Sequence, residues 1–203
     1  MRVLLTGFPA YADAELNPSE QIVAALDGTT VGGAEVAGRM LPVSAEHTPG
    51  AVRAALAETA PDLVLLLGVA PGRTGLSIER VAVNLLDFHL PDNDGARPVD
   101  LPIQPAGPVA YLATLPVRAI AEAWAAARIP GSISETAGLF LCNAAMYTAL
   151  HATAAGGPPA GFLHLPSLPE EVAGQTPPPP SMPLAAQIEG VLSALETALA
   201  ALR

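Results

Sequence analysis

The feature that most constrains the fold is an uninterrupted apolar run, Leu63-Val64-Leu65-Leu66-Leu67-Gly68. Pro61 and Asp62 precede it, and no apolar run in the chain approaches the length that a membrane-spanning segment needs. A strand that is apolar on both faces is typical of a sheet covered by helices on both sides. The run therefore predicts a layered α/β protein with this strand inside its sheet.

The rest of the chain alternates between strand-like and helix-like segments. We expect strands at residues 2–8, 35–43, 63–68, 77–86, 132–136 and 161–165, and helices at residues 17–28, 48–60, 116–127, 142–150 and 184–203. This alternation predicts a three-layer α/β/α sandwich with a twisted, largely parallel sheet. No repeat or linker divides the chain, so we expect a single domain over residues 1–203.

Composition and charge exclude several classes of function. Hydrophobic residues make up 51% of the 203 residues and charged residues 14%, which favours a compact domain over a disordered chain. All nine basic residues are arginine and the net charge is −10, so neither nucleic acid nor a membrane is an expected partner. The absence of lysine excludes a P-loop lysine and a Schiff-base lysine. The start of the chain carries no signal-peptide pattern, which predicts a cytoplasmic protein.

Cys142 is the only cysteine, which forbids an internal disulfide and a cysteine-based zinc site. It opens a helix-like segment that follows a glycine turn at Gly138 and a short apolar stretch. Backbone N–H groups and the dipole at a helix start favour the thiolate, so Cys142 is a candidate nucleophile. A buried structural cysteine is the alternative. The chain offers no ligand cluster for a metal, and we expect no metal and no cofactor.

Two further residues suggest partners for this thiol. His164 interrupts the apolar run of residues 161–166 and is a candidate base. Glu79 lies in another apolar segment, where an unpaired charge is costly, and a histidine partner would explain it. Together they form a Cys–His–acid triad in which Cys142 attacks, His164 takes its proton and Glu79 orients the imidazole. The alternatives are a core histidine and a half-exposed glutamate paired with Arg80.

The chain resembles the pyroglutamyl peptidase type I (pyrrolidone-carboxylate peptidase) family of cysteine peptidases along essentially its whole length. The resemblance rests on ordered blocks that include Thr6-Gly7-Phe8, Asn17-Pro18-Ser19, Leu41-Pro42-Val43, Ile78-Glu79-Arg80-Val81-Ala82-Val83-Asn84, Leu90-Pro91-Asp92-Asn93, Leu139-Phe140-Leu141-Cys142-Asn143 and Gly161-Phe162-Leu163-His164-Leu165-Pro166. It implies that the catalytic acid, nucleophile and base are Glu79, Cys142 and His164. The implied reaction is removal of an N-terminal pyroglutamyl residue from peptides.

The resemblance also implies a substrate site. Phe8 and Tyr11 are expected to grip the flat lactam ring, and Asn17 and Val69 complete the expected substrate-binding set. Backbone N–H groups near the start of the cysteine helix are expected to hold the oxyanion. The apolar composition suggests a homo-oligomer, and the resemblance implies a tetramer.

Three departures from the family pattern leave alternatives open. The stretch Pro9-Ala10-Tyr11-Ala12-Asp13 replaces a Pro-Phe-Gly-Gly-like sequence, Val69 stands where many bacterial members have glutamine, and His89 stands where many have arginine. A related thiol amidase with another acyl-group specificity is therefore one alternative. A non-catalytic small-molecule-binding domain is the other, and the intact triad argues against it.

Overall fold

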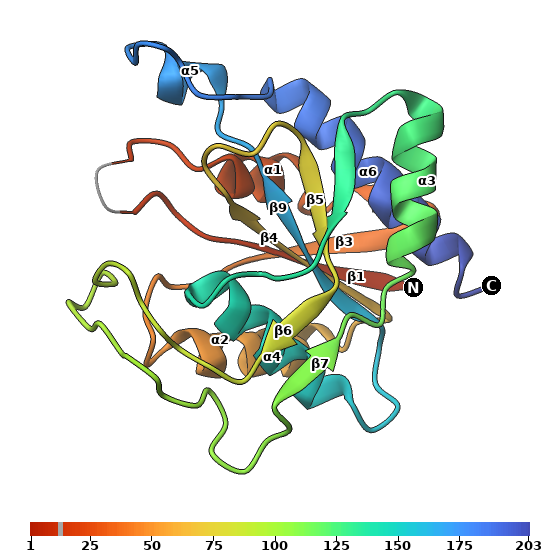
Figure 1. Cartoon of the computed structure of the whole chain (residues 1–203). Helices are drawn as coiled ribbons and strands as arrows, with labels where there is room; N and C mark the ends of the chain where they lie inside the picture. Colours follow the sequence, from red (N-terminus) through yellow and green to blue (C-terminus); the bar gives the residue numbers. More distant parts are fainter. Residues whose placement is uncertain (12–13) are drawn as a thin grey trace.

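The computed structural model describes residues 1–11 and 14–203; Ala12 and Asp13, part of the loop expected after the first strand, lie outside the described residues. A mixed, mostly parallel sheet forms the middle layer, in the order β2-β3-β1-β4-β9-β5-β8 (Figure 1). Its strands are β1 (Arg2–Gly7), β2 (Thr30–Val31), β3 (Ala34–Met40), β4 (Leu63–Val69), β5 (Leu76–Glu79), β8 (Gly131–Ser134) and β9 (Ala160–Leu165). The three-layer α/β fold expected from the sequence is confirmed.

Helices cover both faces of this sheet (Figure 1). Helices α1 (Pro18–Leu26), α3 (Val117–Ala127) and α6 (Leu184–Ala200) pack on one face, and α2 (Thr48–Thr59) and α4 (Leu141–Thr153) pack on the other. The short helix α5 (Pro169–Val172) follows β9. Within the described residues, no helix is long and apolar enough to cross a membrane.

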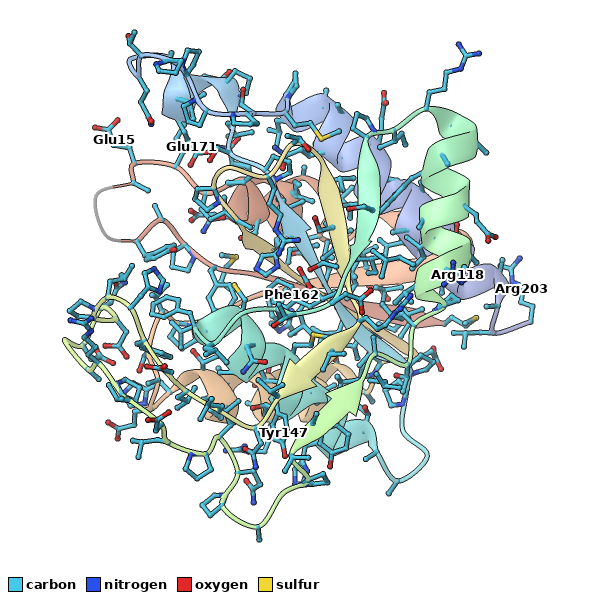
Figure 2. All side chains as sticks on the ribbon, viewed as in Figure 1. Glu15, Arg118, Tyr147, Phe162, Glu171 and Arg203 are labelled. Atoms are coloured by element: carbon cyan, nitrogen blue, oxygen red, sulfur yellow. The ribbon has the colours of Figure 1, made fainter. Side chains whose placement is uncertain are left out.

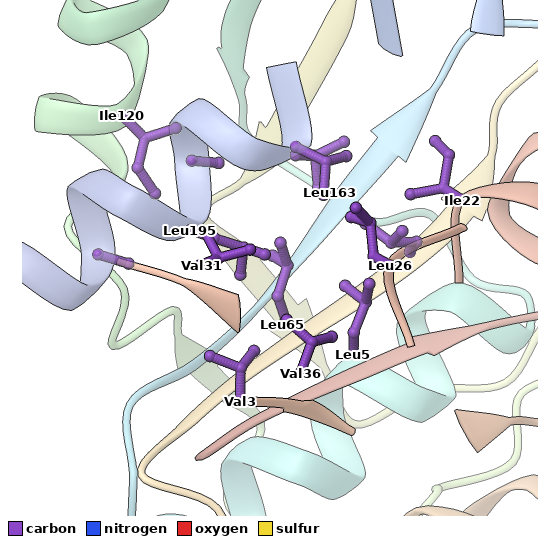
Figure 3. Close-up of a cluster of buried hydrophobic side chains, with 14 of the residues drawn as sticks. Val3, Leu5, Ile22, Leu26, Val31, Val36, Leu65, Ile120, Leu163 and Leu195 are labelled. Atoms are coloured by element: carbon purple, nitrogen blue, oxygen red, sulfur yellow. The ribbon is translucent and has the colours of Figure 1, made fainter. Parts of the chain in front are cut away.

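The central strand β4 divides its side chains between two cores. Leu63, Leu65 and Leu67 belong to the core under α1, α3 and α6, part of which Figure 3 shows around Leu65 and Leu163. Val64 and Leu66 belong to the core under α2 and α4. Because successive side chains of a strand point to opposite faces, an apolar run in a doubly covered sheet feeds both cores.

The segment 77–86, expected as one strand, is split, and this expectation was wrong. β5 ends at Glu79, and β6 (Val81–Val83) leaves the main sheet to pair with β7 (Ala110–Leu112) in a separate two-stranded sheet. In the main sheet β5 runs parallel to β8 and antiparallel to β9. The apolar pattern continues through Arg80, so the sequence gives no local sign of the change of partner. The elements β2, β7 and α5 were also not expected.

Candidate active site

His164 and Glu79 meet across the antiparallel pair β9 and β5. Ser77 is the direct partner of His164 in the register, and Glu79 stands two residues further along β5 on the same face. Long side chains can bridge such a diagonal. The Nδ1–H of His164 donates to Oε1 of Glu79 over 2.7 Å, in buried surroundings. The bond leaves Nε2 as the nitrogen available to a substrate or a thiol.

Glu79 is fully buried and has a second partner. The guanidinium of Arg73 approaches the same Oε1 atom, with Nη2 at 3.1 Å. The suggested pairing of Glu79 with Arg80 is wrong, because Arg80 instead contacts Glu135, with Nη1 3.3 Å from Oε1. The Glu79 carboxylate therefore has two partners, His164 and Arg73, inside the site. This agrees with the free-energy cost of burying a charge without a partner.

Cys142 lies in the first turn of α4, the helix on the same side of the sheet. The helix begins at Leu141, one residue earlier than expected, with Phe140 as its N-cap. The next residue, Asn143, is fully buried and anchors the helix start. Its amide accepts from Val83 N at 2.9 Å and donates to Val83 O and Leu85 O at 2.9 and 3.0 Å. This clamp joins the cysteine turn to β6.

Gly68 on β4 lies beside both the thiol of Cys142 and the strand that carries His164. In the register Gly68 on β4 is the direct partner of His164 on β9. A Cβ atom at Gly68 would stand 2.9 Å from Sγ of Cys142 and 2.8 Å from the ring of Phe162, which is labelled near the centre of Figure 2. The thiol therefore rests directly over the backbone beside His164, in space that only a glycine leaves open.

Burial disfavours the charged forms of both the thiol and the imidazole in this arrangement. The pKa of the Cys142 thiol is raised to about 12, first because burial disfavours the thiolate and second because Glu79 is negative. A hydrogen bond from the Cys142 backbone and the Arg73 cation lower that pKa, but by less. Burial also lowers the pKa of His164, against the opposing effect of Glu79. Desolvation of Cys142 therefore outweighs the helix start, which by itself favours the thiolate.

A small inner pocket opens beside the thiol. Its lining contains Cys142 and all four residues of the expected substrate-binding set; the full lining is Phe8, Tyr11, Asn17, Val43, Gly68, Val69, Phe140, Leu141 and Cys142. Most of this wall is apolar or aromatic, as is typical of small-molecule pockets. The pocket therefore suits a small, largely apolar, flat group.

Phe140 also lines the pocket, whereas the sequence predicts it only as part of an apolar stretch before Cys142. Its ring stacks with Tyr11, with centroids 5.9 Å apart, and also contacts Phe88 and His89. Its position two residues before Cys142 was the signal in the sequence that could have placed it near the thiol.

Asn17 lines the pocket while its amide is committed to the surrounding backbone. Oδ1 accepts from the backbone N–H and the hydroxyl of Ser19 at 3.0 and 2.8 Å, and Nδ2 donates to Pro9 O at 3.0 Å. The Ser19 hydroxyl in turn accepts from Phe8 N at 3.0 Å. Asn17 thus caps α1, as expected, and holds the loop that carries Phe8 and Tyr11.

A wider cleft of about 750 Å³ continues from the thiol toward solvent. Cys142 and His164 both line it, together with Arg73, Asp87 and His89. Two of the departures from the family pattern, Val69 and His89, therefore border the site itself. Among residues 1–11 and 14–203, no group of histidine, cysteine and carboxylate side chains is arranged to hold a metal ion.

Comparison with known proteins gives full-length matches. A family model described as pyroglutamyl peptidase matches residues 1–201. A pyrrolidone-carboxylate peptidase of Pyrococcus furiosus is 43% identical over 204 residues, covering 98% of both chains, and one of Escherichia fergusonii is 41% identical, covering 97% of this chain and 90% of its own. A crystal structure of the Pyrococcus furiosus pyrrolidone carboxyl peptidase superposes with a TM-score of 0.97 at 42% identity, covering 100% of both chains.

Proposed function

Because the chain belongs to the pyroglutamyl peptidase family, we infer that it is a cysteine peptidase that removes an N-terminal pyroglutamyl residue from peptides. Its substrates are pyroglutamyl peptides. We propose Cys142 as the nucleophile, His164 as the general base and acid, and Glu79 as the orienting acid. The observation that supports this most directly is the inner pocket, an aromatic cavity lined by the thiol of Cys142. The same thiol borders the cleft that His164 lines, and His164 is bonded to the buried Glu79.

The proposed reaction proceeds through a thioester. Sγ of Cys142 attacks the carbonyl carbon of the pyroglutamyl residue while its proton moves to Nε2 of His164, which Glu79 stabilises as imidazolium. The tetrahedral intermediate collapses, and His164 returns the proton to the leaving amine as the C–N bond breaks. Water, deprotonated by His164, then attacks the thioester. Pyroglutamate leaves and the thiol is restored.

A neutral thiol–imidazole pair fits this sequence of steps. With the pKa of the thiol raised and that of His164 lowered, the proton transfers as the substrate is attacked and not before. Backbone N–H groups of the first turn of α4, where Phe140 provides no side-chain cap, are suitable donors to the oxyanion.

The inner pocket supports recognition of the lactam ring. The rings of Tyr11 and Phe140 stack, and Phe8 borders the same space, so their faces suit a neutral planar ring. Val69 has no side-chain donor, and the amide of Asn17 is already bonded to Pro9 and Ser19. The donor to the lactam carbonyl is therefore a backbone N–H group or a side chain other than Val69.

The experiment that tests the function compares two aryl amides on one preparation, pyroglutamyl amide and prolyl amide. Proline has the same ring without the lactam oxygen and carries a charged amine. We expect kcat/KM to favour the pyroglutamyl amide by roughly 10⁴-fold, because buried polar groups of the site stay unpaired with proline. Comparable values would instead support a broader thiol amidase.

We propose a homo-oligomer as well, with the tetramer as the expected form. Four exposed apolar side chains near β7 support a partner on this side of the molecule: Val99, Leu101, Val109 and Leu112. Light scattering after size-exclusion chromatography measures the subunit number directly. A monomer at micromolar concentration would contradict the proposal. The cytoplasmic location stays a prediction.

A further inference from the structure

Arg73 stands at the boundary between the cleft and the buried acid. It lies in the turn between β4 and β5, where its backbone N–H bonds Ala70 O at 3.3 Å and Gly72 adopts a φ of +83°. Its side chain is 30% exposed and lines the cleft, whereas its partner Glu79 is 0% exposed. The guanidinium therefore reaches from the edge of solvent to an anion that water does not reach.

Both partners of Glu79 approach the same carboxylate oxygen. Arg73 Nη2 lies 3.1 Å from Oε1, and His164 Nδ1 lies 2.7 Å from it. The other oxygen, Oε2, is buried without a hydrogen-bond partner in the described part of the chain. A buried carboxylate without a nearby cation favours its protonated, neutral form. Protonation would remove the charge that holds the imidazole of His164 in position.

The other charged and titratable groups around this centre do not replace Arg73. Tyr11, Asp87, His89, Cys142 and His164 border the cleft, and none carries a permanent positive charge. Arg80 follows Glu79 in sequence but contacts Glu135. Among the described residues, Arg73 is the one arginine in contact with the carboxylate.

We propose that Arg73 is a positioning residue of the triad, which holds the Glu79 carboxyl group with its Oε1 directed at His164. This inference rests on the proposed function of the site. Arg73 does not contact the reacting atoms in this role; it acts through Glu79. Its removal is expected to affect the protonation of the base as well as the rate.

The direction of the effect on pH dependence follows from the charge that Arg73 places near His164. The positive charge of Arg73 lowers the pKa of His164, so its loss raises that pKa. The proposed reaction needs a neutral His164 as the base. The loss of the charge therefore moves the acidic limb of kcat/KM to higher pH in Arg73→Gln.

The test measures kcat/KM for the pyroglutamyl aryl amide against pH in the wild type, Arg73→Gln, Arg73→Lys and the control Arg80→Gln. We expect the acidic limb of Arg73→Gln to rise by about one pH unit, with a rate at least tenfold lower at neutral pH. Arg73→Lys should keep the limb within about 0.3 units, and Arg80→Gln should match the wild type. Were Arg73→Gln not to fold, a full-unit shift in Arg73→Lys would overturn the proposal.

A second measurement does not depend on turnover. NMR titration of the four histidine rings follows His164 directly, identified by its absence in His164→Gln. We expect His164 to protonate at higher pH in Arg73→Gln than in the wild type. An unchanged titration and an unchanged acidic limb, with only a lower rate, would assign Arg73 a purely structural role. An inactive wild type in which the titration still shifts would refute the proposed function and leave the role of Arg73 supported.

Discussion

Nδ1 of His164 and Oε1 of Glu79 lie 2.7 Å apart although 85 residues separate them in the chain. The antiparallel pairing of β5 with β9 produces this contact, because it places both side chains on the face of the sheet that carries α4. The one antiparallel neighbour of β9 is thus the element that delivers the acid.

The triad assignment predicts unequal effects of removing its members. His164→Ala should be as damaging as loss of the thiol, because the proton then has no acceptor, whereas Glu79→Gln should retain some activity. The measurement is kcat for the pyroglutamyl aryl amide in folded variants. Near-wild-type rates in both would place the catalytic groups elsewhere.

Gly68 provides a steric test of the nucleophile position. In Gly68→Ala the new methyl group would stand 2.9 Å from Sγ of Cys142 and 2.8 Å from Phe162, closer than real contacts allow. Displacement of the thiol should lower kcat at least 100-fold, since misplacement by about 1 Å has that order of effect. Gly50→Ala is the matched control, because nothing lies within 4 Å of its added Cβ. Equal activity of the two variants would show that the thiol is not confined there.

The protonation state of the thiol is open to direct titration. With the pKa of Cys142 raised to about 12, thiolate is scarce at neutral pH, and alkylation by iodoacetamide should speed up about tenfold per pH unit up to pH 9 or above. The label should map to Cys142, the only cysteine. A rate that levels off below pH 7 would instead indicate a preformed thiolate–imidazolium pair.

Tyr11 should act mainly in substrate binding. Its ring stacks on Phe140 and lines the inner pocket, so Tyr11→Ala should raise KM more than it lowers kcat if it holds the ground state and the transition state alike. Tyr111→Ala is the control, since Tyr111 contacts Tyr147 and His151 at β7 instead. A Tyr11→Ala variant with unchanged KM would exclude Tyr11 from ring recognition.

Much of this architecture follows from local patterns. The two-sided apolar run of β4 predicts the doubly covered sheet, and the placement of His164 and Glu79 in apolar segments predicts their burial. The expected pocket residues Phe8, Tyr11, Asn17 and Val69 do line one cavity with the thiol. Such features depend on spacing and residue type, which the sequence contains.

The remaining features depend on contacts between distant segments. The partner of Glu79 is decided by the direction of β5 and by the turn that carries Arg73, and neither has a local signature. The raised pKa of the Cys142 thiol likewise depends on how the folded chain shields it from water. This desolvation outweighs the effect of the helix start, which the sequence does indicate. The stacking of Phe140 on Tyr11 also joins two distant segments of the chain.

The central claim is that Cys142 performs the hydrolysis, and the most direct test is turnover of the pyroglutamyl aryl amide by Cys142→Ala and wild type purified in parallel. We predict that the variant folds like the wild type and loses nearly all release of the aryl amine, roughly 10⁴-fold or more, because no other group can form the thioester. Full activity in Cys142→Ala would contradict the account and end the assignment of this site as a thiol peptidase.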